Sequence, residues 1–518
     1  MADAYTLSTR VANLGTLVPG VDAMEQLVSA GLTNIDADGK LRPQLAEAVP
    51  TVENGLWRTF PDGRMETTWK IRPNIEWHDG HAFSMADLLF TARIDADRDL
   101  PFPRAIAQES IDSVEASDGQ TITVKWKRPY VQADALFGTI LPAHLLEAQY
   151  LEDKANLAQL SYWSDDFVGT GPFKLKEWSR SSHMIVQAND RYVLGRPKVD
   201  EIEIRFIPDP STLMANILAG QIDVTLGKTL GLEQAAQVRD QWSAGAMEVG
   251  FRSWIMMYPQ FIGASPAAVS DVRFRRALLH ALDRQQMVDA LMFGIVPVAH
   301  SMLNPNHPAY ATVQPGIASY PYDVRRATEI IDGAGYGRGA DGMLRDTDDR
   351  PLTIEVRTTA GFDIQEKSLF AIAENWRQAG VTVETTLVPP QRSRTDAEYM
   401  ATFPGFLLIQ QPNDPMDLRR YHISSARLPE NNYRECCYMR YSNPDYDRLV
   451  DRFFVTIPIA DRNHVLAQII QHQTDQAILA GLFYNVEPTM ISKKLNNIAA
   501  RKSQNGVQSW NAELWEAS

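Results

Sequence analysis

The stretch LTIEVRTTAGFDIQEKSLFAIAENWRQAGVTVET, residues 352–385, decides the fold class of this chain. Apolar and polar residues alternate from Leu352 to Val356, which is typical of a half-buried β-strand. Apolar residues then recur at helical spacing up to Trp376, and Gly380 is the residue type that often follows a helix. A second alternating segment begins at Val381. Strand, helix and strand in this order predict a βαβ unit with a right-handed crossover.

The same pattern occurs earlier in the chain. Apolar and charged residues alternate from Glu201 to Phe206, and a helix is expected from Pro210 to Gly220. Residues 222–224 then resume an extended pattern. A second βαβ unit is therefore predicted, and the chain should contain at least two α/β lobes.

The first third of the chain carries strand and turn signals instead. Strands are expected at 67–71 and 121–126, where apolar and polar residues alternate. Ser84, followed three residues later by Asp87, predicts a capping box at the start of a helix. This region is therefore expected to consist of short strands and turns.

Composition sets the class of protein. The 518 residues suffice for roughly three domains, and 44% of them are hydrophobic, which excludes collagen-like, disordered and disulfide-framework proteins. The net charge of −14 argues against nucleic acid as a partner. The first five residues contain no basic and apolar export signal, so either the protein is cytoplasmic or the signal has been removed and Met1 stands in its place.

Motifs for catalysis are absent from the sequence. No G-x-S-x-G, H-E-x-x-H, C-x-x-C or P-loop pattern occurs, so neither an enzyme nor a cofactor is expected. His78 and His81 flank an Asp-Gly turn, where two imidazoles could contact a metal, but no third ligand is evident and a surface turn is favoured. The adjacent Cys436 and Cys437 leave two readings open: a disulfide ring that contacts a ligand, or two small buried residues.

A long segment without charged residues extends from Ala290 to Tyr322 and contains five prolines. The prolines exclude a membrane-spanning helix. Two interpretations of this segment remain open: it packs against protein or ligand, or it is a simple connecting loop.

Seven short segments in a fixed order carry a family resemblance. They are residues 41–47 (LRPQLAE), 69–80 (WKIRPNIEWHDG), 83–87 (FSMAD), 169–173 (GTGPF), 218–223 (LAGQID), 271–278 (DVRFRRAL) and 441–447 (YSNPDYD). From about Leu32 to Tyr484 the chain resembles the extracellular solute-binding proteins of family 5, the oligopeptide- and dipeptide-binding class (cluster C) that serves ABC importers.

The resemblance implies an α/β fold of the type II periplasmic-binding-protein kind, with two hinged lobes and an extra subdomain in lobe one. Lobe one is expected to comprise residues 1–35, 166–252 and 474–518, with the extra subdomain at 36–165 and lobe two at 253–473. Hinge closure would trap the ligand, and the membrane permease would recognise the closed form. The resemblance further implies a monomer that is periplasmic or extracellular, with an export signal, such as a lipoprotein signal, already removed.

The resemblance also suggests the ligand class. In peptide-binding relatives an aspartate just before the Asp-Pro pair contacts the peptide amine, and the matching position here is Gln411. Because an amide cannot neutralise an ammonium, a charge-assisted contact worth about 1.5–3 kcal/mol would be missing. The apolar strand 254–258 suggests a pocket wall, with a core strand as the alternative. A neutral or weakly charged ligand is therefore expected: an oligosaccharide, a modified peptide or an aromatic metabolite.

Positions that match the ligand-contacting segments of the family complete the expected site. Leu226 and Gly227 correspond to a segment whose backbone binds ligand in relatives. The predicted ligand-binding residues are Trp254, Met256, Tyr258, Leu226, Gly227, Gln410, Gln411, Asn413, Asp414, Cys436 and Cys437, and no catalytic or metal-binding residue is predicted.

Three alternatives stay open at this point. The first is a peptide binder of the same family in which Asp414 takes the amine. The second is a hydrolase that acts in the same cleft through paired carboxylates. The third is a sensory protein that presents its ligand to a membrane receptor.

Overall fold

The computed structural model describes residues 6–14, 20–103, 106–346, 349–502 and 507–518. The expectation about an export signal concerns residues 1–5, which lie outside the described residues. The chain forms two compact units. Unit 1 comprises residues 1–250, 454–458 and 487–518, and unit 2 comprises residues 251–453 and 459–486.

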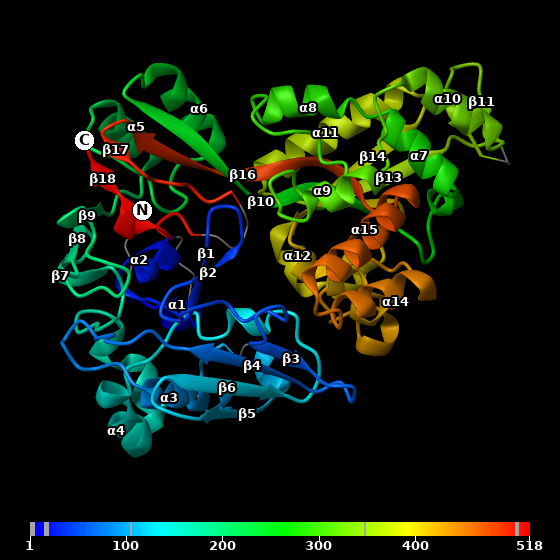
Figure 1. Ribbon diagram of the computed structural model, residues 1–518. Coiled ribbons are helices and arrows are strands. Elements are labelled where there is room, and N and C mark those ends of the chain that lie inside the picture. The colour runs from blue at the N-terminus through cyan, green and yellow to red at the C-terminus, as the bar shows by residue number, and fades with distance from the viewer. Residues whose placement is uncertain (1–5, 15–19, 104–105, 347–348, 503–506) are drawn as a thin grey trace. The chain divides into compact units, whose positions relative to one another are not determined.

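A four-stranded antiparallel sheet forms one part of unit 1, in the order β3-β4-β6-β5, with α3 beside it (Figure 1). The alternation that predicts β4 (Met65–Lys70) corresponds to alternating burial along that strand. Trp69 is fully buried and meets the ring of Phe137 edge to face at 6.1 Å. The predicted capping box is confirmed, because Ser84 and Asp87 cap the first turn of α3 (Met85–Ala96).

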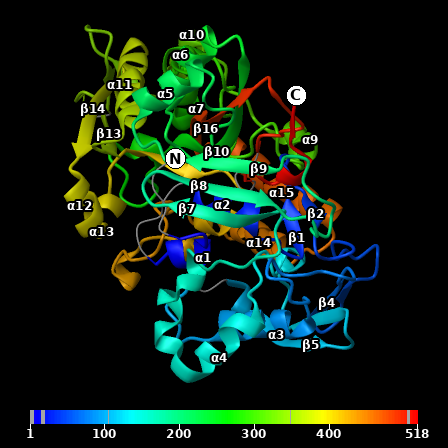
Figure 2. The ribbon, with the colours of Figure 1, turned by 90° about the vertical axis from the view of Figure 1, so that its left-hand side faces the viewer.

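A three-stranded antiparallel sheet, β7-β8-β9, forms a second part of unit 1 (Figure 2). Its inward-facing residues, such as Phe173 and Met184, are fully buried. They belong to the same apolar core as Leu27 of α2 and Trp163. This shared core joins the N-terminal helices to the sheet.

The predicted βαβ unit at residues 201–224 is wrong in its pairing. The strand β9 (Glu201–Arg205) and the helix α5 (Pro210–Leu218) form as expected, with Asp209 capping the helix. Residues 222–224, however, make only an antiparallel bridge, from Val224 to Ile491. Their backbone groups are satisfied there, and a cavity of about 370 Å³ separates this segment from β9. The segment therefore joins the strand that returns from unit 2.

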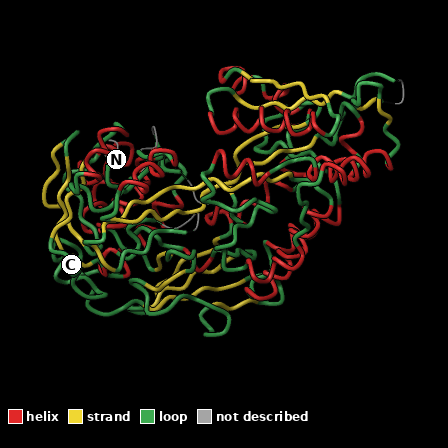
Figure 3. The backbone as a smooth tube through the Cα atoms, turned by 90° about the horizontal axis from the view of Figure 1, so that it is seen from above, coloured by secondary structure: helices red, strands yellow, loops and turns green. Residues whose placement is uncertain are grey.

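The predicted βαβ unit at residues 352–385 is confirmed. The strands β13 (Thr353–Thr359) and β14 (Thr382–Val388) pair in parallel, and the helix α11 (Asp363–Gln378) connects them. They belong to a five-stranded mixed sheet in the order β14-β13-β15-β10-β16. Figure 3 shows helices flanking the strands of unit 2. Trp376 of α11 packs against Phe406 at 5.2 Å between ring centroids, which covers one face of the sheet.

The elements of the described chain have the following bounds. The helices are α1 (Thr9–Ala12), α2 (Val21–Val28), α3 (Met85–Ala96), α4 (Ala143–Asp153), α5 (Pro210–Leu218), α6 (Leu232–Gln241), α7 (Val272–His280), α8 (Arg284–Leu291), α9 (Tyr310–Val313), α10 (Val324–Gly333), α11 (Asp363–Gln378), α12 (Pro390–Thr395), α13 (Ala397–Ala401), α14 (Pro444–Phe453) and α15 (Ile459–Asp475). The strands are β1 (Thr33–Ile35), β2 (Leu41–Pro43), β3 (Trp57–Thr59), β4 (Met65–Lys70), β5 (Ile111–Ala116), β6 (Thr121–Trp126), β7 (Phe173–Ser179), β8 (His183–Ala188), β9 (Glu201–Arg205), β10 (Gly245–Pro259), β11 (Gly337–Arg338), β12 (Leu344–Arg345), β13 (Thr353–Thr359), β14 (Thr382–Val388), β15 (Phe406–Pro412), β16 (Ala480–Ser492), β17 (Leu495–Asn496) and β18 (Glu516–Ala517).

Within the described part of the chain, no helix combines the length and the apolar character that crossing a membrane requires.

Candidate functional site

The strands β10 and β15 bring the central predicted residues together in unit 2. They pair antiparallel, with Trp254 opposite Gln411 and Met256 opposite Ile409. Directly opposed residues share a face of the sheet, and neighbours along a strand alternate between faces. Trp254, Met256, Tyr258 and Gln411 therefore lie on one face. Gln410 is exposed and lies on the opposite face.

Four aromatic residues, here called the aromatic cluster, gather on that face: Trp254, Tyr258, Tyr421 and Tyr438. The ring of Tyr258 lies 6.4 Å from that of Tyr421 and 6.5 Å from that of Tyr438. Tyr421 ends the 3₁₀ helix Pro415–Tyr421, which follows β15. Burial raises the pKa of Tyr258 and of Tyr421 well above the ordinary value for a phenol. Both hydroxyls therefore stay uncharged.

Trp254 is enclosed, with 1% of its surface exposed. Its indole lies over Gly481 of β16, where an added Cβ would come within 2.6 Å of the Trp254 ring. The indole Nε1 and the Tyr421 hydroxyl are buried and make no hydrogen bond of full geometry to the described residues. The Trp254 and Tyr258 side chains lie close to the Tyr421 hydroxyl and partly oppose the rise of its pKa, so the polar atoms of these three residues lie close together.

A disulfide joins Cys436 to Cys437, and its contact with a ligand stays a prediction. Cys436 is exposed and Cys437 is buried. The backbone N–H of Arg427 donates to the Cys437 carbonyl at 3.0 Å. The Arg427 guanidinium also lies 4.2 Å from the centroid of the Tyr438 ring. The disulfide is thus held beside an edge of the aromatic cluster.

The end of β15 supplies the remaining predicted residues of unit 2. Asn413 is buried, with 1% of its surface exposed. Asp414 is partly exposed, and its Oδ1 accepts a hydrogen bond from the Met416 N–H at 2.7 Å, which caps the following 3₁₀ helix. One carboxylate oxygen of Asp414 therefore has a structural role.

Leu226 and Gly227 belong to unit 1, whereas the other predicted residues belong to unit 2. Leu226 is half-buried and packs against the core of the β7-β8-β9 sheet. Gly227 has a φ of +82°, in the left-handed region that glycine adopts without strain.

Tyr421, Tyr438 and Arg427 were not predicted from the sequence. Arg427 and Tyr438 lie outside helices and strands, and Tyr421 ends a short 3₁₀ helix, so no periodicity indicates which of these side chains face a neighbouring strand. The vicinal cysteines are the sequence signal nearest to them, since Tyr438 follows Cys437 directly.

The two histidines at the Asp-Gly turn have different surroundings. His78 contacts backbone groups of residues 169 and 171. The ring of His81 stacks on that of His144 at 4.0 Å, and the His144 Nε2 lies 2.8 Å from Asp79 Oδ2. In the part of the chain that the structure describes, no three His, Cys, Asp or Glu side chains are arranged to hold a metal ion.

Comparison with known proteins gives one family. The family of bacterial extracellular solute-binding proteins, family 5, matches residues 40–424. The oligopeptide-binding protein AppA of Bacillus subtilis is 25% identical over 444 residues, which cover 82% of this chain and 75% of AppA. The nickel-binding periplasmic protein of Escherichia coli is 24% identical over 504 residues, 94% of this chain and 90% of that protein.

Among solved structures, the ABC transporter substrate-binding protein CtaP of Listeria monocytogenes superposes with a TM-score of 0.75. The two chains are 19% identical, and the match covers all of this chain and 98% of CtaP. At this level of identity the similarity shows the fold alone.

Proposed function

This chain belongs to the bacterial extracellular solute-binding proteins, family 5, and from that premise we propose that it traps a neutral or weakly charged ligand of medium size. Proteins of the family bind small ligands or peptides for ABC importers, and they are periplasmic or extracellular. The proposed ligand is an oligosaccharide, a modified peptide or an aromatic metabolite. Binding proceeds by hinge closure of the two lobes and without chemical conversion.

The observation that carries this proposal is that neither the aromatic cluster nor Gln411 supplies a carboxylate, while the charge beside the cluster is the Arg427 guanidinium on Tyr438. The carboxylate that would neutralise a peptide amine is replaced by an amide, and that amide lies opposite Trp254 in the sheet. Tyr258 and Tyr421 remain neutral. Aromatic faces with a few polar atoms suit sugar rings and other uncharged cyclic groups.

The ligand first meets the accessible edge of the cluster. Tyr438 is partly exposed and Cys436 is exposed, whereas Trp254 is enclosed. The flat surface of the Cys436–Cys437 ring and the Tyr438 ring would then contact one side of the ligand. Leu226, Gly227, Asn413 and Asp414 complete the proposed ligand-binding set, whereas Gln410 lies on the opposite face of the sheet and is not part of it.

A thermal-shift screen over oligosaccharides, free dipeptides, N-acetylated dipeptides and aromatic metabolites tests the ligand class. A ligand at 100 times its dissociation constant adds about 2.7 kcal/mol to the free energy of unfolding, which such a screen detects. We expect hits among uncharged compounds. For the best hit, Tyr438→Ala should weaken binding at least tenfold, whereas Tyr322→Ala, at an exposed position elsewhere in unit 2, should leave affinity unchanged.

Peptide binding is the second candidate, because a relative is named for oligopeptide binding and Asp414 directly follows the ligand-contacting segment. Isothermal titration calorimetry with a dipeptide and its N-acetylated form separates the two candidates. A strong preference for the free amine that disappears in Asp414→Asn would replace the neutral-ligand proposal. Equal affinities for the two forms would support it.

Recovery of the ligand distinguishes binding from hydrolysis. After prolonged incubation with the best hit, mass spectrometry should return the compound unchanged. Appearance of cleavage products in amounts above those in a protein-free control would contradict a purely binding role.

A further inference from the structure

The uncharged segment 290–322 folds back along the edge of the unit 2 sheet. Val298 bridges Phe483 of β16 in antiparallel fashion, and the Ala299 N–H donates to the Leu482 carbonyl at 3.1 Å. The segment then lines an open cavity of about 310 Å³ together with residues of α8 and β16. The lining residues are Gln285, Pro297, Val298, His300, Ser301, Pro305, Tyr310, Ile317 and Tyr484.

This cavity lies on the opposite face of the sheet from the aromatic cluster. Trp254 lies over Gly481, and Tyr484 is three residues further along the same strand, so its side chain faces the other side. In agreement, the centroid of the Tyr484 ring lies 5.4 Å from that of the Phe251 ring. Phe251 and Trp254 are three positions apart in β10, so their side chains lie on opposite faces of the sheet. Ligand contacts in the cavity are thus separate from those of the proposed function.

A buried positive charge lies directly behind the cavity. Arg284 is 4% exposed, and its guanidinium donates to the carbonyls of Gly481 at 3.0 Å and Tyr320 at 2.8 Å. Within the described part of the chain no carboxylate forms a salt bridge with it. Burying a charge without a countercharge is costly, and an anion in the cavity would reduce that cost.

His300 lies between the Arg284 guanidinium and the cavity. The Arg284 Nη2 lies 3.4 Å from the His300 Nδ1, which can only accept, so the neutral ring carries its proton on Nε2. Burial and Arg284 lower the pKa of His300 to about 4, which agrees with this neutral form. Neither the His300 Nε2 nor the Tyr310 hydroxyl donates a hydrogen bond to any described residue. The cavity therefore offers two free donors.

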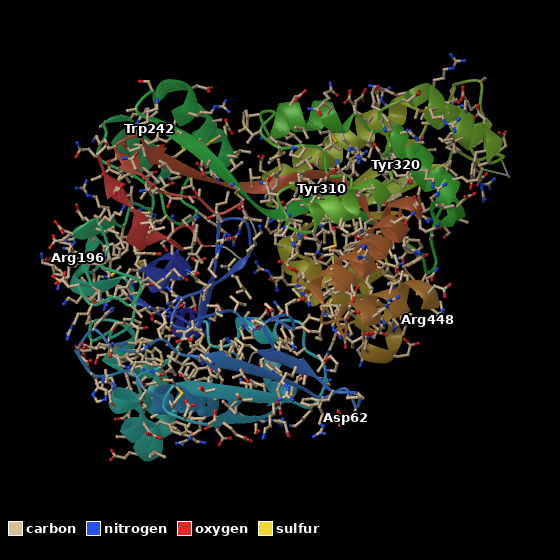
Figure 4. All side chains as sticks on the ribbon, viewed as in Figure 1. Asp62, Arg196, Trp242, Tyr310, Tyr320 and Arg448 are labelled. Carbon is tan, nitrogen blue, oxygen red and sulfur yellow. A yellow bond between two sulfur atoms is a disulfide. The ribbon has the colours of Figure 1, made fainter. Side chains whose placement is uncertain are left out.

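The remaining wall is apolar. Pro297, Val298, Pro305 and Ile317 line the cavity beside the two donors. Figure 4 labels Tyr310 and Tyr320, which both lie in the segment that forms this region of unit 2. An arrangement of paired donors, one buried cation and an aliphatic wall matches a molecule with one anionic end and a short apolar body.

We propose that this cavity, the carboxylate pocket, binds a small aliphatic carboxylic acid through the His300 Nε2 and the Tyr310 hydroxyl, with Arg284 supplying the positive charge. The pocket would act as a ligand site independent of the one on the aromatic face. This proposal does not depend on which ligand binds at the aromatic face.

Isothermal titration calorimetry on the full chain tests the proposal with hexanoate and its neutral counterpart 1-hexanol. For a ligand this small we expect a dissociation constant of about 1 mM for hexanoate. Hexanol should bind at least tenfold more weakly. Saturation that fails to appear by about 10 mM hexanoate, or equal affinities for acid and alcohol, would overturn the assignment.

Point variants locate the binding. Tyr310→Phe removes only the hydroxyl and should weaken hexanoate about three- to tenfold, and His300→Gln should weaken it by a similar factor. The control Tyr322→Phe makes the same chemical change at an exposed position of the same segment and should leave affinity unchanged. Unaltered binding in both pocket variants would refute the proposal.

A variant on the other face separates this pocket from the proposed function. Trp254→Phe should leave hexanoate affinity unchanged, because Trp254 faces away from the carboxylate pocket. Loss of hexanoate binding in this variant would place the acid in the aromatic cluster and overturn the carboxylate pocket. The effect of Trp254→Phe on the affinity for the thermal-shift hits tests the proposed function alone.

Discussion

His78 joins two segments that are far apart in the sequence. Its Nδ1 accepts from the Gly169 N–H at 3.2 Å, so its Nε2–H donates to the Gly171 carbonyl at 3.1 Å. The two glycines also approach residues 28 and 29 closely. An added Cβ on Gly169 would lie 1.9 Å from the Val28 carbonyl oxygen, and one on Gly171 would lie 2.4 Å from the Val28 carbonyl carbon. The segments 77–80 (WHDG) and 169–171 (GTG) are thus held together by the two hydrogen bonds of His78.

Acid should weaken this contact. Burial lowers the pKa of His78 from 6.5 to about 4 in the folded chain. The unfolded chain therefore binds more protons between these two values, and the free energy of unfolding falls as the pH drops from about 6.5 to about 4. The contribution of His78 reaches up to about 3 kcal/mol. Urea unfolding at a series of pH values should show a smaller loss in His78→Gln, because glutamine can donate and accept without titrating.

The matched control is His464→Gln, at an exposed position of α15. This variant should retain the acid sensitivity of the parent protein. Identical pH dependence in His78→Gln and the parent would show that His78 is not the group that titrates.

At the scale of elements, the helix α7 holds the end of α15. Arg275 donates to the carbonyls of Ala477 at 3.1 Å and Gln476 at 2.8 Å, and Arg276 donates to the Asp475 carbonyl. The last carbonyls of a helix lack partners within the helix and carry partial negative charge, so cations are stabilising there. The family motif DVRFRRAL therefore has a structural role in this chain.

Replacing Arg275 should destabilise unit 2 strongly. Arg275→Met leaves at least two buried carbonyls without their charged donor, and we expect a loss of about 3 kcal/mol in the free energy of unfolding. Arg273→Met, two residues away in the same helix, removes an exposed salt bridge with Asp271 and should cost at most about 1 kcal/mol. Denaturant unfolding followed by circular dichroism measures both. Equal losses would contradict the capping role of Arg275.

Reduction of the Cys436–Cys437 disulfide should affect ligand binding more than stability. Adjacent cysteines close almost no loop in the unfolded chain, so the bond restricts unfolded conformations little. We expect reduction to change the free energy of unfolding by less than about 1 kcal/mol. The same treatment should change the affinity for the best thermal-shift hit.

Thiol counting under denaturing conditions verifies the redox state, with no free thiol before reduction and two after it. An affinity that stays the same in both states would remove the disulfide from the proposed site.

At the scale of the molecule, the chain connects its two units more than once. It leaves unit 1 after Gly250, within β10, and returns after Val486, within β16, with a further short excursion at residues 454–458. Two long strands shared between compact units are suited to act as a hinge, because a small change in each can rotate a whole unit.

Small-angle X-ray scattering tests hinge closure directly. A single compact body of 518 residues has a radius of gyration of about 24 Å. We expect the ligand-free protein to exceed this value and a saturating concentration of the best thermal-shift hit to lower it. Hexanoate, whose pocket lies within unit 2, should cause no such decrease. A radius that does not change with the thermal-shift hit would contradict closure.

Local sequence patterns predicted most elements because they depend on contacts close in the chain. The Ser84 capping box and the βαβ unit at 352–385 both formed as expected. The seven family segments predicted the family and the fold, because they occur in a fixed order along most of the chain. The uncharged run 290–322 is evident in the sequence, but no pattern within it indicates which residues line a cavity.

The sequence by itself determined the family, the α/β class and the apolar strand that bears Trp254. Only the tertiary structure decided which strand residues 222–224 pair with, which aromatic rings contact Tyr258, and where Arg284 lies relative to His300. Each of these depends on groups more than ten residues apart, and periodicity reports only which side of an element is apolar. The partner that covers that side is chosen by packing and by the hydrogen bonds that remain to be satisfied.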